Sequence, residues 1–163
     1  MKRLIDIIIS LIVLILFSPI GIIIILLLRI SGEGEVFYKQ LRVGKFNKNF
    51  NLIKFVTMVK DSPNIGAGDI TLKNDPRVLP FGRILRKTKL NEFPQFINVL
   101  KGDMSLVGPR PLVLNQFKMI PQNFAKIIVK MQPGITGIGS IIFRNEESYL
   151  DNKDKSNEFY SKE

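Results

Sequence analysis

The most pronounced pattern along the chain is an apolar run close to its start. Residues 7–28 contain no charged side chain. These 22 residues are enough for a membrane helix, because crossing the bilayer core takes about 20 residues. Ser18 and Pro19 interrupt the run near its centre, and a proline removes a helical hydrogen bond and disfavours helical geometry in the residue before it. We therefore expect a membrane-inserted helix with a break or sharp kink at Ser18-Pro19.

Basic residues flank this run on both sides, with Lys2 and Arg3 before it and Arg29 after it. A helix that simply spans a membrane concentrates such residues on its cytoplasmic side. Two interpretations remain open from the residues alone. One is a re-entrant helix over residues 1–32 whose two ends both face the cytoplasm, and the other is an ordinary kinked transmembrane helix. Both predict membrane lipid as a partner.

After residue 33 the pattern changes to short elements. The segments VFYKQ (36–40) and FNLIKFVTM (50–58) predict two strands with a turn region between them. Residues 60–76 are rich in Gly, Pro, Asn and Asp and lack apolar periodicity. They predict a mobile loop, which we expect beside an active centre because loops on a rigid scaffold commonly carry function. A short helix is expected from about residue 81 to 88.

A second amphipathic helix is predicted to begin near Asn91 and to end at Gly102. Its apolar face comprises Leu90, Phe93, Phe96, Ile97 and Leu100. Asn91 is the expected N-cap, and Glu92 falls in the first turn, where the helix dipole favours negative charge. The preceding residues include four cations, Arg83, Arg86, Lys87 and Lys89. The pair Asn91-Glu92 either caps the helix or belongs to a site that handles phosphates.

Composition narrows the chemistry. The chain has no cysteine and no histidine, which excludes disulfides, thiolate nucleophiles and histidine-dependent triads. A bound metal would need oxygen ligands, as Mg²⁺ does. The formal net charge of +10 favours an anionic lipid surface, a phosphorylated substrate or a nucleic acid. No nucleic-acid-binding motif accompanies the charge, so we expect no nucleic acid among the partners.

Four segments resemble the bacterial sugar transferases, which are monotopic phosphoglycosyl transferases. They are LFSP (16–19), KFVTM (54–58), LNEFPQFINVLKGDMSLVGPRP (90–111) and PGITGIG (133–139). The resemblance implies a small α/β monotopic membrane protein, mostly helical with few short strands. It implies a re-entrant membrane helix at residues 1–32 and a cytoplasmic sugar transferase domain at 33–163, on the cytoplasmic face of the bacterial inner membrane.

The resemblance also implies a function. Family members transfer a sugar-1-phosphate from a UDP-sugar donor to a polyprenol (undecaprenyl) phosphate acceptor, the first membrane step of exopolysaccharide, capsule, O-antigen or glycoprotein glycan synthesis. Asn91 and Glu92 occupy the catalytic pair, and Glu92 is the expected Mg²⁺ ligand. Lys54, Arg86 and Arg110 are expected to bind substrate phosphates. Downstream glycosyltransferases and a second copy of the chain are possible partners.

The sequence departs from the family pattern in three places. Asn91 stands where the family has a nucleophilic aspartate, and a carboxamide cannot form an ordinary acyl phosphate. Gln132 replaces a frequent arginine, and family members usually continue beyond the equivalent of residue 163. Two functions follow. The first is a transferase in which Glu92 is the nucleophile or positions Mg²⁺ for direct transfer. The second is a catalytically silent membrane scaffold that binds nucleotide sugars or glycosyltransferases.

Overall fold

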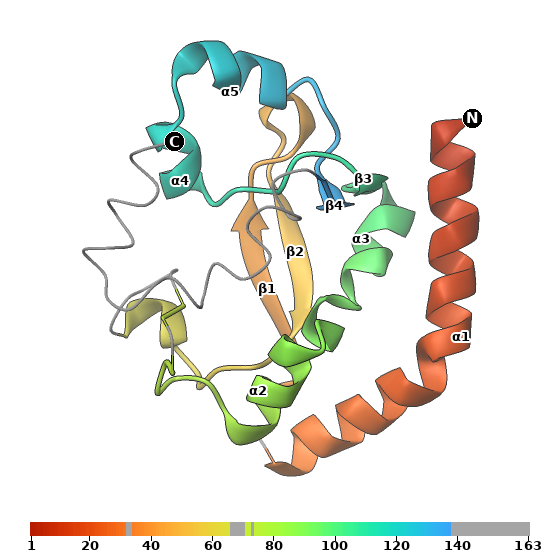
Figure 1. Ribbon diagram of the computed structural model, residues 1–163, viewed down its shortest axis with the longest axis vertical. Helices are drawn as coiled ribbons and strands as arrows, with labels where there is room; N and C mark the ends of the chain where they lie inside the picture. The colour runs from red at the N-terminus through yellow and green to blue at the C-terminus, as the bar shows by residue number, and fades with distance from the viewer. Residues whose placement is uncertain (32–33, 66–70, 73, 138–163) are drawn as a thin grey trace.

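The computed structural model describes residues 1–31, 34–65, 71–72 and 74–137. A long helix, α1 (Lys2–Ser31), runs along one side of a small α/β unit (Figure 1). That unit contains β1 (Phe37–Arg42), η1 (Lys45–Asn47), β2 (Phe50–Phe55), η2 (Ser62–Asn64), α2 (Pro80–Lys87), η3 (Leu90–Glu92), α3 (Gln95–Lys101), β3 (Ser105–Val107), α4 (Leu114–Met119), α5 (Gln122–Ile128) and β4 (Gly134–Thr136). The predicted fold class, mostly helical with few short strands, is confirmed.

Helix α1 is continuous and includes Pro19. It bends sharply about midway along its length (Figure 1). The hydroxyl of Ser18 donates to the carbonyl of Ile15 at 2.8 Å, a local side-chain bond of the kind that often accompanies a bent helix. Of the two outcomes expected at Ser18-Pro19, the structure has the kink and not an interruption. Residues 15–20, around the bend, are all exposed.

The second half of α1 packs on the apolar core of the α/β unit. Its buried residues Ile24 and Leu28 join Val36, Phe55 and Leu85 in one cluster. This side of α1 is buried because its apolar residues recur at helical spacing and meet apolar side chains from β2 and α2.

The first turns of α1 contact the same unit through polar groups. The Arg3 guanidinium donates to the carbonyls of Val99 (2.5 Å) and Leu100 (2.8 Å), which belong to the last turn of α3. Free carbonyls at a helix C-terminus are favourable acceptors for a cation. Helix α3 thereby lies between α1 and β2 (Figure 1).

The predicted strands pair with each other. β1 and β2 are antiparallel, with Phe37 opposite Phe55 and Tyr38 opposite Lys54. The second strand ends at Phe55, three residues earlier than predicted, and Met58 forms an isolated bridge with Val78 instead.

A second, parallel pair joins β3 to β4. A side chain on Gly108, Gly134 or Gly137 would overlap backbone atoms of the opposite segment. This close approach explains why glycine is required in both the GPRP and PGITG segments. Residues 138–163, including the last two residues of the PGITGIG segment, lie outside the described part of the chain.

The helix predicted from Asn91 begins later than expected. Residues 90–92 form η3, and α3 starts at Gln95 with Pro94 at its N-cap position. The prediction that Asn91 caps the helix is therefore wrong, and the reason is that the rigid ring of Pro94 sets the helix start. The predicted end is confirmed, because Gly102 adopts the left-handed conformation with φ 91°.

Candidate active site

The centre of the candidate site is an ion pair between β2 and η3. Lys54 Nζ lies 3.3 Å from Glu92 Oε1, and these side chains are 22% and 33% exposed. Lys54 precedes the final residue of β2, and Glu92 closes the turn before α3. Residues 38 positions apart are thus brought into contact. A partly exposed carboxylate held against an ammonium group can face a polar substrate.

Burial and the surrounding charges set the pKa values of Lys54 and Glu92. Burial lowers the pKa of Lys54, Glu92 opposes this by raising it, and the neighbouring cations Arg42 and Arg110 lower it further. For Glu92, burial by itself would raise the pKa, but Lys54, Arg110 and Lys89 outweigh it and hold the pKa below its usual value. Glu92 is therefore an ionised carboxylate at neutral pH, surrounded by positive charge.

The GPRP corner brings Arg110 to this group. Arg42, the last residue of β1, donates to the carbonyl of Pro111 at 3.0 Å, and the Val43 amide donates to the Leu112 carbonyl at 2.9 Å. These bonds hold the corner against the end of β1. Arg110 is exposed but close enough for its charge to act on both Lys54 and Glu92. Lys89 was among the four cations that the sequence placed before Asn91, whereas sequence reasoning did not single out Arg42, because nothing local distinguishes it from a surface cation.

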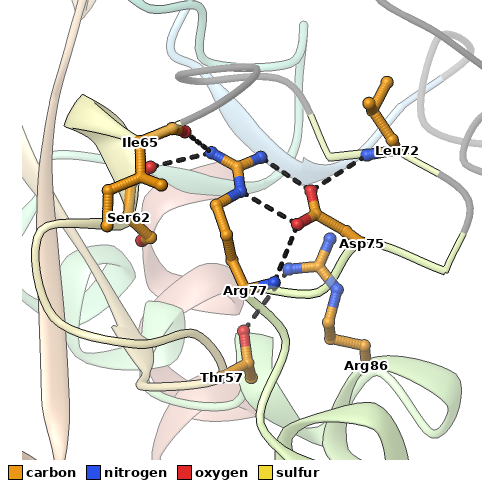
Figure 2. Close-up of polar contacts among 7 residues, drawn as sticks. All are labelled: Thr57, Ser62, Ile65, Leu72, Asp75, Arg77 and Arg86. Atoms are coloured by element: carbon orange, nitrogen blue, oxygen red, sulfur yellow. Dashed lines mark hydrogen bonds and ion pairs between the residues drawn. The ribbon is translucent and has the colours of Figure 1, made fainter.

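Arg86, on α2, contacts the segment that follows β2. Its guanidinium Nη1 lies 3.3 Å from the hydroxyl of Thr57 (Figure 2). The carbonyl of Thr57 accepts a hydrogen bond from the Leu79 amide at 3.0 Å, and a side chain on Gly82 would overlap the Thr57 backbone. Thr57 is therefore the residue against which α2 packs. The structure brings Lys54, Glu92 and Arg110 together, and Arg86 contacts Thr57, which lies three residues after Lys54.

A buried ion pair closes the stem of the segment predicted as a loop (Figure 2). The Arg77 guanidinium donates to both Asp75 carboxylate oxygens, at 2.9 and 2.7 Å, and to the carbonyls of Ser62 and Ile65. Hydrogen bonds from the Arg77 side chain hold the pKa of Asp75 down at about 2. Sequence reasoning missed this pair, although an acidic and a basic residue two positions apart in a Pro-rich segment was an available signal.

Asn91 lies beside the pair but does not contribute a charge. It is 6% exposed. Its Oδ1 atom is enclosed and accepts no hydrogen bond from the described residues. An unpartnered buried carbonyl is costly, and such atoms often mark places where a fold serves a site rather than its own stability.

The protein ligands at the site fit Mg²⁺ only if substrate phosphates and water complete its coordination. Within the described residues, no three acidic, histidine or cysteine side chains cluster in a manner that could hold a metal. Glu92 is the carboxylate at the centre of the site, and Lys54 contacts one of its oxygens. Mg²⁺ is often held by one or two carboxylates together with substrate phosphates and water. The residues present fit an ion of that kind.

Comparison with known proteins identifies the family. The model of the bacterial sugar transferase family matches residues 1–163. The chain belongs to this family.

Several curated relatives agree with this assignment. The exopolysaccharide production protein ExoY of Rhizobium meliloti is 35% identical, covering 91% of this chain and 71% of that protein. The UDP-glucose:undecaprenyl-phosphate glucose-1-phosphate transferase of Escherichia coli is 38% identical, covering 98% of this chain and 35% of the relative. An undecaprenyl-phosphate N-acetylgalactosaminephosphotransferase of Aeromonas hydrophila is 40% identical over 86% of this chain. The chain spans about a third of the length of several relatives that it matches.

Proposed function

We propose that this protein transfers a sugar-1-phosphate from a UDP-sugar to undecaprenyl phosphate or a similar polyprenol phosphate. The observation that carries the proposal is the ionised Glu92 carboxylate held among Lys54, Arg110 and Lys89. Such a group suits a diphosphate substrate, because the cations neutralise phosphate charge and the carboxylate supplies a nucleophile or a metal ligand. Relatives named for this type of reaction support the choice of substrates.

The reaction exchanges one phosphoanhydride bond for another. An oxygen nucleophile attacks the β-phosphorus of the UDP-sugar, the bond from that phosphorus to the bridging oxygen breaks, and UMP leaves. In direct transfer the nucleophile is the acceptor phosphate, and the diphosphate product forms in one step. In the two-step route the Glu92 carboxylate attacks first, and the acceptor then displaces the sugar phosphate from Glu92. Lys54, Arg86 and Arg110 bind phosphate oxygens in either route. Mg²⁺ held by Glu92 and the donor would supply further charge neutralisation.

The arrangement of α1 supports a re-entrant position in the membrane. A straight helix of 30 residues is about 45 Å long, more than the roughly 30 Å core of a bilayer. If α1 spanned the membrane, its first turns would lie on the far side, away from α3. They instead contact α3 and β3 through Arg3 and Asp6, while the second half of α1 packs on the core of the same unit. These contacts support one side of the membrane for both ends of α1 and the transferase unit, and we propose that this side is the cytoplasmic face of the inner membrane.

The second candidate is a catalytically silent membrane scaffold that binds nucleotide sugars or glycosyltransferases. The observation that favours it is Asn91, whose neutral carboxamide stands at the position of the family nucleophile. The cations at Lys54, Arg86 and Arg110 would still bind a diphosphate in such a protein, because none of them depends on a charge at position 91.

The decisive experiment measures UMP release in nanodiscs with Mg²⁺, undecaprenyl phosphate and a panel of UDP-sugars. The variants are Asn91→Asp, Glu92→Gln and, as a matched control at an exposed site, Asn115→Asp. Acceptor-dependent release by the unmodified chain that disappears in Glu92→Gln establishes transfer. A sugar phosphate trapped on Glu92 establishes the two-step route, and its absence during steady release establishes direct transfer.

Silence in the unmodified chain together with release by Asn91→Asp establishes the scaffold with an otherwise intact site. Silence in every variant contradicts the transferase proposal. Binding of the UDP-sugars, measured by calorimetry on the same samples, then decides whether the scaffold survives.

A further inference from the structure

Asn98, in the middle of α3, joins that helix to β2. It is 1% exposed. Its Oδ1 accepts a hydrogen bond from the Ile53 amide at 3.0 Å, and its Nδ2 donates to the Asn51 carbonyl at 2.8 Å. The carboxamide thus binds the edge of β2 as the backbone of a neighbouring strand would, with one donor and one acceptor.

Asp103 orients this carboxamide. Asn98 Nδ2 also donates to Asp103 Oδ2 at 3.1 Å. The main-chain carbonyl of Asn98 accepts hydrogen bonds from the amides of Asp103 (3.0 Å) and Met104 (3.3 Å) in the turn after α3. With its oxygen and nitrogen both committed, the side chain cannot turn over without breaking contacts on both sides, so it allows a single register of α3 against β2.

That register has a consequence at the candidate site. Lys54 immediately follows Ile53 on β2, and Glu92 lies at the start of the segment that continues into α3. A shift of α3 along β2 by one residue would displace Glu92 from Lys54 by about the length of their 3.3 Å contact, because a strand rises about 3.3 Å per residue.

We propose that Asn98 is a positioning residue which, with Asp103, sets the register of α3 on β2 and so holds Lys54 against Glu92. The inference deepens the proposed function, because it names the residues that place its carboxylate. The Asn98 side chain bonds the backbone of Asn51 and Ile53, just before Lys54 in β2, and makes no hydrogen bond to the charged group of Lys54 or Glu92. Its role is to position, not to react.

The test measures the chemical reactivity of the Lys54 amine. The chain in nanodiscs is treated with a water-soluble amine reagent, and the labelling rate of Lys54 is read by mass spectrometry relative to Lys39, an exposed lysine on β1. In Asn98→Asp the side chain loses its donor and faces the Asp103 carboxylate. Lys54 should then label about tenfold faster, as expected for loss of roughly 1.4 kcal/mol of contact energy.

A swapped pair tests the proposed contact directly. In Asn98→Asp combined with Asp103→Asn, the donor is moved to position 103 and the two side chains can bond again. The bond from position 98 to the Asn51 carbonyl stays lost, so labelling of Lys54 should fall part of the way back from the single variant toward the unmodified chain. Asn51→Asp is the matched control, because Asn51 is exposed and its main-chain carbonyl, which the substitution keeps, makes the contact with Asn98. The labelling rate of Lys54 should not change in this variant.

Several results would overturn the proposal. One is Asn98→Asp labelling Lys54 at the unmodified rate while the melting temperature falls, which would make Asn98 a merely stabilising residue. Another is a swapped pair as reactive as the single variant. If Asn98→Asp does not fold, Asp103→Ala replaces it, and unchanged labelling in that variant contradicts the proposal. The labelling does not depend on transfer, so normal positioning without UMP release would count against the proposed function and not against the role of Asn98.

Discussion

Asp6 in the second turn of α1 accepts a hydrogen bond from the hydroxyl of Ser105, 99 positions later, at 2.9 Å. Its other oxygen accepts a bond from the Leu106 amide at 3.1 Å. Both side chains are buried. The start of the apolar helix is therefore fastened to β3 by a carboxylate, at the point where the KGDMS segment ends. The apolar helix and the strand that leads to Arg110 share this contact.

Removing the charge at this contact should destabilise the protein. In Asp6→Asn one buried acceptor becomes a donor that faces the Ser105 hydroxyl or the Leu106 amide. We expect a loss of about 1–3 kcal/mol and a melting temperature lower by several degrees. The control Asp61→Asn makes the same change at an exposed residue. Equal melting temperatures for the two variants, measured in the same detergent, would show that the contact contributes nothing.

The two ends of α1 should be reached from the same side of the membrane. The chain has no cysteine, so Lys2→Cys and Arg29→Cys each introduce a single thiol at an exposed position. A membrane-impermeant maleimide should label both in inside-out vesicles and neither in spheroplasts. Labelling of one position in each preparation would instead establish a spanning helix and refute the re-entrant placement.

Thr57 should matter for donor binding through Arg86. Thr57→Val keeps the shape of the side chain but removes the oxygen that accepts from Arg86. UDP-sugar affinity should fall about fivefold, because a guanidinium that loses an acceptor is held less firmly. Thr57→Ser retains the hydroxyl and should bind within about twofold of the unmodified chain. Calorimetry measures both, and equal affinities for the valine and serine variants would exclude this role.

Gly134, where the GPRP and PGITG segments cross, should not tolerate a side chain. In Gly134→Ala the new methyl group would overlap the backbone of Gly108, and backbone cannot move aside as a flexible side chain can. We expect little folded protein by size-exclusion chromatography. Gly21→Ala serves as the control, because its added methyl group would meet the Phe93 ring at an ordinary 3.4 Å and alanine favours the helix. A Gly134→Ala variant as stable as this control would contradict the crossing.

The Asp75–Arg77 pair should make stability fall in acid. The folded pKa of Asp75 is about 2 against a usual 3.8, so the unfolded state binds the proton more readily. The stabilisation is complete above about pH 5 and decreases as the pH falls toward 2, by about 2 kcal/mol in total. Asp75→Asn should melt at a lower temperature at pH 7, and its melting temperature should change less between pH 5 and pH 3. Parallel pH profiles for the two proteins would contradict this.

The residues of the candidate site were predictable to different degrees. Glu92, Lys54, Arg86 and Arg110 followed from the resemblance to a family, and the structure brings three of them to one place. The residues that arrange them, Asn98 and Thr57 above all, carried no local signal. An asparagine in a helix and a threonine at a strand end are ordinary until the partner across the fold is known.

The sequence by itself determined the elements whose cause is local. The apolar run from 7 to 28, the proline that bends it and the glycine that ends α3 act through neighbours in the chain, so pattern and propensity suffice to predict them. The tertiary structure alone decided that both ends of α1 contact one unit, that Lys54 meets Glu92, and that Asn91 is buried. Each of these depends on side chains tens of residues apart, and the free energy that selects such contacts appears only when the whole core packs.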